Sequence, residues 1–243
     1  MGSVPPDAGR FATTRWSVVL AAGSPSSPHY EQALGTLCET YWFPLYAYLR
    51  RRGYDMHQAE DAIQAFFARL LEKNGLHRAQ QNRGRFRSFL LASLKNILAD
   101  EWDRAQAQKR GGQSKVLSLD VATAETRYSF ESTDRLSPEK VFERSWALTV
   151  LKQAMDQLKT ESAAADKIQL FEYLKATLAG DKNSVSYKEV AVKLNMSEGA
   201  VKAAVYRLRR RYRELVRQEV SQTVATEEQI EEEIRDLFVS LAR

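Results

Sequence analysis

The sequence is short of the residues that build disulfide frameworks and metal centres. Among its 243 residues there is one cysteine, Cys38, and there are three scattered histidines, His29, His57 and His77. A single cysteine excludes an intramolecular disulfide and a cysteine cluster for zinc, and isolated histidines make a poor metal-binding or catalytic set. We therefore expect no metal, no cofactor and no enzymatic activity.

Long apolar runs are also missing. No run approaches the roughly 18 residues that a bilayer-spanning helix needs. Residues 1–10 have neither the basic start nor the apolar core of a signal peptide. Hydrophobic residues make up 44% and charged residues 28%, as in soluble globular proteins. We expect a folded cytoplasmic protein without a membrane partner, built as one large domain or as two small ones of about 100 residues each.

Positive charge is modest in total but concentrated in two blocks. The net charge is +5, yet residues 78–115 and residues 186–217 each hold nine Lys or Arg against three Asp or Glu. Residues 218–243 reverse the sign, with seven acidic residues and two basic ones. Basic blocks attract polyanions by neutralising phosphates, although solvated helix faces give similar counts. Charge alone therefore does not decide between nucleic-acid binding and a solvated basic surface.

The hydrophobic pattern predicts an all-α fold, because apolar residues recur every three or four positions and strict alternation is rare. The expected helices cover residues 30–51, 58–73, 86–108, 138–160, 163–179, 186–194 and 197–219. Ser137 followed by Pro138 is a favourable helix start, since proline at the first turn loses no hydrogen bond.

The chain divides into two predicted helical bundles. Residues 112–137 have few periodic apolar positions and many Ser, Thr and Asp, which predicts an extended linker. The linker would separate a first domain, residues 30–111, from a second, residues 138–219. Residues 1–29 form an N-terminal extension for which no structure is predicted. Residues 220–243 form an acidic C-terminal extension.

This acidic extension has the pattern of an amphipathic helix. Thr226 and Gln229 match a capping box. The apolar residues that then recur on one helix face are Ile230, Ile234, Leu237, Phe238 and Leu241. An isolated helix of this length is marginal in water, so the apolar face needs a surface to pack on. It either completes the core or folds back on the second domain, where its carboxylates would compete with phosphates for residues 207–213.

Residues 186–215 match the pattern of a helix-turn-helix. The apolar positions of a short first helix are followed by a turn at Asn195 and Met196, and Ser197 is a candidate N-cap for a second helix. Val201 and Val205 mark the buried side of that second helix, so its basic side faces outward toward a major groove. A basic amphipathic helix packed in an ordinary bundle is the alternative.

Two segments of the first bundle resemble a known family. Residues 59–67 read AEDAIQAFF and residues 89–100 read FLLASLKNILAD. In this order they resemble region two of the extracytoplasmic-function (ECF) sigma factors of the sigma-70 superfamily, and the helix-turn-helix falls where region four belongs. The resemblance covers residues 30–110 and 138–217. Ala65, where the family commonly has glutamate, and Phe89, where many members have tryptophan, depart from it.

The resemblance implies a factor that directs transcription initiation. Asp61 and Gln64 would contact the beta-prime clamp helices of core RNA polymerase, the beta flap would be a second contact, and an anti-sigma factor is a possible further partner. The residues implied at the minus-ten element of promoter DNA are Arg83, Arg85, Phe86, Arg87, Phe89 and Asn96. Those expected at the minus-35 element are Ser197, Lys202, Tyr206, Arg207, Arg209, Arg210 and Arg211, with the last three on phosphates.

Three other functions compete with this interpretation. A stand-alone helix-turn-helix regulator would bind duplex DNA without polymerase. A helical phosphohydrolase built on His57, Glu60 and Asp61 is disfavoured, because no second His and Asp pair lies at ligand spacing. An inert helical scaffold would leave both basic blocks unexplained.

Overall fold

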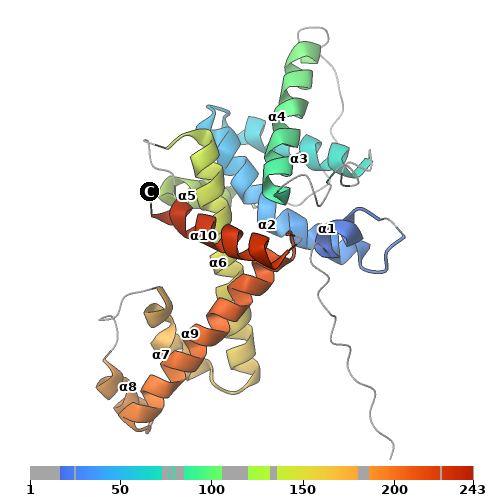
Figure 1. Ribbon diagram of the computed structural model, residues 1–243. Coiled ribbons are helices and arrows are strands. Elements are labelled where there is room, and N and C mark those ends of the chain that lie inside the picture. The colour runs from blue at the N-terminus through green and yellow to red at the C-terminus, as the bar shows by residue number, and fades with distance from the viewer. Residues whose placement is uncertain are drawn as a thin grey trace, which may run out of the picture.

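The computed structural model describes residues 17–24, 26–72, 76, 79, 85–105, 120–131, 136–179, 186–224 and 226–242. Every regular element within these ranges is a helix, and none is a strand. The all-α fold class predicted from the hydrophobic pattern is therefore confirmed (Figure 1).

The first part of the chain is organised around one long central helix. In chain order its helices are α1 (Ser17–Ala22), α2 (Tyr30–Arg51), α3 (Met56–Glu72), α4 (Phe86–Ala105) and α5 (Val121–Glu131). Helix α2 has the predicted bounds, and Pro44 lies inside it without ending it. All residues from 43 to 49 are buried. A helix that is apolar on every side belongs in the interior, and α2 is covered by α1, α3 and α6.

The extended linker predicted for residues 112–137 is wrong where α5 lies. Glu125 of α5 accepts hydrogen bonds from the hydroxyl of Tyr46, at 2.5 Å, and from Nε of Arg50, at 2.6 Å. Both partners belong to α2. Ala124 also enters the core, but few other residues of α5 are strongly apolar, so no hydrophobic period revealed the helix.

A second residue of α5 ties it to α6. The Arg127 guanidinium lies over the Phe43 ring, 3.8 Å from its centroid, and Nη2 donates to the hydroxyl of Thr149 at 2.8 Å. Helix α5 therefore bridges the two predicted bundles rather than keeping them apart.

The second part of the chain begins at the predicted cap. The Ser137 side chain accepts a hydrogen bond from the Lys140 N–H, and Pro138 occupies the first turn. The elements that follow are α6 (Pro138–Ala164), α7 (Ile168–Leu174), the 3-10 helix η3 (Lys175–Ala179), α8 (Tyr187–Lys193), α9 (Glu198–Ser221) and α10 (Glu227–Leu241). None of the described helices combines the length and apolar composition needed to cross a membrane.

One hydrophobic core joins the two parts. Helix α6 packs against α2, α9 and α10 (Figure 1). Leu45 and Ile63 from the first part belong to the same buried cluster as Trp146, Val216 and Leu237 from the second. The domain boundaries near residues 111 and 138 stay predictions, but the two bundles are in close contact.

Candidate nucleic-acid interface

The predicted helix-turn-helix segment forms two helices joined by a tight turn. The side chain of Ser186 caps α8 by accepting from the Glu189 N–H, and that of Ser197 caps α9 by accepting from the Ala200 N–H at 3.1 Å. Asn195, in the turn, has a φ of +50°, a conformation that asparagine tolerates better than most residues. Local sequence signals therefore set both helix starts and the turn.

A small hydrophobic cluster of its own holds this segment together. Its buried members are Leu174, Val190, Ala191, Val201, Ala204 and Val205. They come from α7, α8 and α9, and small alanines stand where the helices approach one another. The predicted buried side of α9 is thereby confirmed, and the opposite side is left to solvent.

The exposed side of α9 is basic and aromatic. Lys202, Arg207 and Arg210 are exposed, and the Tyr206 side chain is 68% exposed. Nζ of Lys202 pairs with the carboxylate of Glu198 at 2.7 Å, which raises the pKa of Lys202. This cation therefore stays charged on the face that the sequence assigns to DNA.

Two of the arginines expected at phosphates, Arg209 and Arg211, contact other helices of the protein. Arg209 donates from Nη2 to the carbonyl oxygen of Thr177 at 2.9 Å. Arg211 forms a bidentate pair with Glu161, with distances of 2.7 and 2.8 Å. Both arginines fasten α9 to the helices beneath it. Their role at phosphates stays a prediction, whereas their structural contacts are direct.

The predicted polymerase contacts on α3 differ in accessibility. Asp61 is exposed, while Gln64 is only 7% exposed. Gln64 therefore borders the buried side of this amphipathic helix, and the contact of both residues with polymerase stays a prediction. Ala65 is half-buried beside it.

The residues predicted at the minus-ten element also differ in accessibility. Phe86 is 1% exposed and packs edge-on against Tyr41, with ring centroids 5.4 Å apart. Phe89 stacks on Phe86 at 6.0 Å and is partly buried, and Asn96 is exposed. Arg83 lies outside the described residues. A direct contact of Phe86 with a DNA base is thus not available here, because the ring is part of the core.

Arg87 is withdrawn from solvent as well, and for an electrostatic reason. Its side chain is 3% exposed and forms ion pairs with Glu143 of α6, at 2.7 Å, and with Glu233 of α10. Arg85 pairs with Glu233 at 3.1 Å and with Asp236. Burial raises the pKa of both Glu143 and Glu233. The two arginines are therefore neutralised by three carboxylates, which we call the α4–α10 ion cluster.

Sequence reasoning missed these three acidic partners. The tail was expected either to complete the core or to face residues 207–213. Ile230 and Leu237 do enter the core, while Glu227 and Glu231 pair with Arg217, beyond the expected basic run. Glu233 and Asp236 are three residues apart, which places them on one helix face. This spacing was the sequence signal that could have indicated a shared basic partner. The predicted capping box of Thr226 and Gln229 is confirmed.

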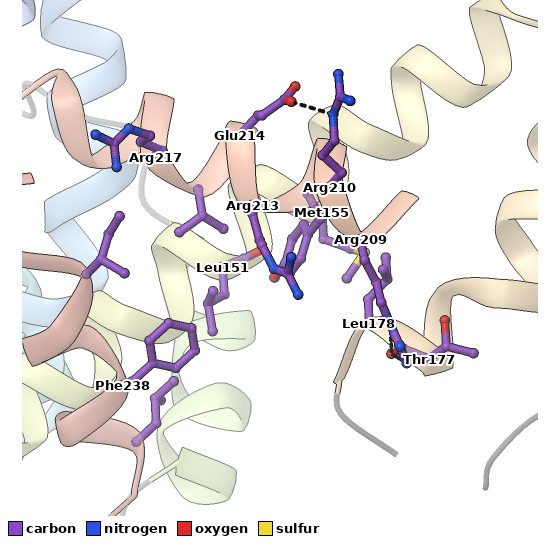
Figure 2. Close-up of a pocket in the computed structure, with 14 residues that line it drawn as sticks. Leu151, Met155, Thr177, Leu178, Arg209, Arg210, Arg213, Glu214, Arg217 and Phe238 are labelled. Atoms are coloured by element: carbon purple, nitrogen blue, oxygen red, sulfur yellow. Dashed lines mark hydrogen bonds and ion pairs between the residues drawn. The ribbon is translucent and has the colours of Figure 1, made fainter. Parts of the chain in front are cut away.

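A groove of about 960 Å³ opens between α6, α9 and α10 (Figure 2). Apolar side chains that include Leu151, Met155 and Phe238 line its floor and one wall, and Arg209 and Arg213 extend from α9 along the other (Figure 2). Phe238 is 57% exposed. The groove therefore combines an apolar surface with positive charge.

Within the described ranges, no group of three or more His, Cys, Asp or Glu residues is placed to hold a metal ion. His57, Glu60 and Asp61, which a phosphohydrolase would need, are thus not joined by further ligands in this part of the chain.

The protein is helical, and it contains a pair of capped helices, α8 and α9, whose outer side is basic. Residues 38–108 match the family model described as Sigma-70 region 2. The matched stretch contains α3, α4 and most of α2, and it supports a place in the sigma-70 superfamily. Neither the curated proteins nor the solved structures gave a match.

Proposed function

We propose that this protein is an ECF-type sigma factor, which binds core RNA polymerase in the cytoplasm, recognises the minus-35 and minus-ten elements and directs transcription initiation. The observation that carries the proposal is the match of residues 38–108 to Sigma-70 region 2. Its supporting observation is the later position of α8 and α9, whose basic outer side suits a second DNA element.

The minus-35 element is assigned to the outer side of α9. Lys202, Tyr206 and Arg207 lie on the first turns of a helix that begins at a capped N-terminus, the part that enters a major groove in helix-turn-helix proteins. Long basic side chains and a phenol can reach base edges there, while Arg210 is placed farther along for a phosphate.

Two surfaces are assigned to core polymerase. Asp61, exposed on α3, is the contact for the beta-prime clamp helices. The groove between α6, α9 and α10 is assigned to the beta flap, because its apolar floor and its arginines fit an amphipathic helical element with acidic side chains. An anti-sigma factor would use one or both of these surfaces.

The test is run-off transcription with purified core polymerase on a library of promoter fragments, together with co-purification of core. We expect promoter-dependent transcripts with the natural chain and fewer with Asp61→Ala. The matched control is Glu39→Ala, because Glu39 is an exposed carboxylate in the middle of α2, away from α3. The absence of both transcripts and core binding at low salt would end the sigma-factor proposal.

A stand-alone DNA-binding regulator is the second candidate, and one observation favours it. The outer side of α9 is open, whereas Phe86 and Arg87 are buried. In this conformation the protein is equipped for duplex DNA but not for the minus-ten strand. A regulator would protect its operator from nuclease without polymerase, whereas a sigma factor protects its promoter only with core polymerase.

A further inference from the structure

The acidic C-terminal helix covers residues that the proposed function assigns to the minus-ten element. Helix α10 lies across α6 and α9 and reaches the start of α4 (Figure 1). There Glu233 and Asp236, three residues apart and so on one helix face, pair with Arg85 and Arg87. Residues as far as 151 positions apart in the sequence therefore form one ion cluster.

The carboxylates of the cluster outnumber its guanidinium groups, and one further cation, Lys140, lines the pocket beside it. Two guanidinium groups face three carboxylates, from Glu143, Glu233 and Asp236. The Arg87 guanidinium also lies over the Trp146 ring, 4.4 Å from its centroid, so one more side is closed. A DNA phosphate that approaches Arg85 and Arg87 would meet a surplus of negative charge.

Helix α10 is held in this position along its whole length. Its apolar residues Ile230 and Leu237 are buried, Arg217 pairs with Glu227 near its start, and Arg144 donates to the carbonyl oxygen of Leu241 at its end, at 3.1 Å. A helix of 15 residues is marginal on its own, so these contacts are what keep it folded in place.

We propose that α10 is an internal competitor of single-stranded promoter DNA: its carboxylates occupy Arg85 and Arg87, and the helix must move away before the minus-ten strand binds. The inference rests on the proposed minus-ten role of these arginines. Phosphate oxygens would replace the carboxylates as acceptors, so the arginines exchange one set of charge-assisted hydrogen bonds for another. Displacement of α10 also exposes Ile230 and Leu237, so the contacts with DNA must offset the lost burial as well as the lost ion pairs.

The test uses the full-length chain and matched charge variants. The probe is a fluorescent single-stranded oligonucleotide of mixed sequence, and binding is followed by anisotropy at several salt concentrations. Glu233→Gln and Asp236→Asn each remove one carboxylate from the α4–α10 ion cluster. Glu232→Gln is the control, because it changes the charge by the same amount at an exposed neighbour on the same helix.

We expect each cluster variant to bind the oligonucleotide about three- to tenfold more tightly than the natural chain, and Glu232→Gln to bind within about twofold of it. Circular dichroism checks that the variants remain folded. Asp236→Asn, at a side chain 41% exposed, keeps the test valid if Glu233→Gln does not fold. Equal binding by Asp236→Asn and Glu232→Gln would overturn the proposal.

A second measurement follows the helix itself. Amide hydrogen exchange in residues 227–241 of the natural chain should become faster when the oligonucleotide is added in excess, because α10 leaves its site. Unchanged protection at saturating DNA would also overturn the proposal. Neither the binding measurement nor the exchange measurement needs polymerase. If both succeed while the run-off assay fails, the sigma-factor function is rejected, but the competition between α10 and single-stranded DNA still holds.

Discussion

Arg87 and Glu233 lie 146 residues apart in the sequence, yet their side chains form an ion pair in which they are 3% and 2% exposed. Removing two charges from water is costly, and only additional hydrogen bonds offset the cost. Arg87 has these from Glu143, at 2.7 Å, and Glu233 has a second partner in Arg85, at 3.1 Å. The pair is therefore well satisfied, but each partner depends on the other.

This dependence predicts an asymmetric response to mutation. Arg87→Met should lower the free energy of unfolding by about 3–5 kcal/mol, because Glu233 is left charged and buried near one remaining arginine. The double variant Arg87→Met with Glu233→Met should recover most of this loss, since no unpaired charge remains. Urea unfolding of the natural chain and the variants measures both effects. Additive losses in the double variant would contradict the interpretation.

The ion cluster also predicts how stability depends on pH. Burial raises the pKa of Glu233 above the ordinary glutamate value, with Arg87 and Arg85 opposing and Glu143 reinforcing the effect. A raised pKa in the folded state means that the carboxylate favours unfolding, so stability falls as pH rises from the ordinary glutamate pKa through the folded value.

We therefore expect Glu233→Gln to weaken this fall. Asp236 and Tyr41 also face the cluster, and their charges are unchanged by the substitution. The measurement is urea unfolding between about pH 4 and pH 8, where the natural chain should lose stability relative to Glu233→Gln as the pH increases. A difference between the two proteins that stays constant over this range would refute the expectation.

Ser197 serves the fold directly, because its side chain caps α9 through the Ala200 N–H. Ser197→Ala should lower the free energy of unfolding by about 1 kcal/mol, as is usual for a lost N-cap, and Ser197→Asn should restore it. Thermal melting checks the stability, and binding to duplex DNA checks the interface. If Ser197→Asn restores stability but not DNA binding, the hydroxyl has a separate role at DNA.

Substitutions of Arg207 and Arg211 should have different effects, the first on DNA binding and the second on the stability of the fold. Arg207→Ala, on the exposed side of α9, should weaken cognate DNA binding by about 1–3 kcal/mol and leave stability unchanged. Arg211→Ala should lower stability by about 0.5–1 kcal/mol, because it breaks a partly exposed bidentate pair with Glu161. Nitrocellulose filter binding and chemical denaturation report the two effects, and an equal loss of stability in both variants would show that the faces are misassigned.

Local signals explain what the sequence predicted well. The caps at Ser137 and Ser197 and the capping box at Thr226 are all encoded within a few residues of where they act. The buried side of α9 follows from its apolar period. These features need no knowledge of the rest of the chain.

Distant polar contacts explain what the sequence did not reveal. Helix α5 depends on the bond from Tyr46 to Glu125, 79 residues away, and no hydrophobic period marks it. The burial of Gln64 and Arg87 was equally hidden, because polar residues on a helix are expected to face solvent. Their partners come from elements that only the folded chain brings together.

Helix α9 has a geometric consequence of its own. It runs without a break from the segment that we assign to DNA into the main core, and Leu208 packs against both hydrophobic clusters. The direction in which the exposed basic side of α9 points is therefore fixed relative to α2 and α6. One residue inserted between Leu208 and Leu215 would turn that side by about 100°, whereas seven residues would nearly restore its direction and shift it by about 10.5 Å along the helix axis.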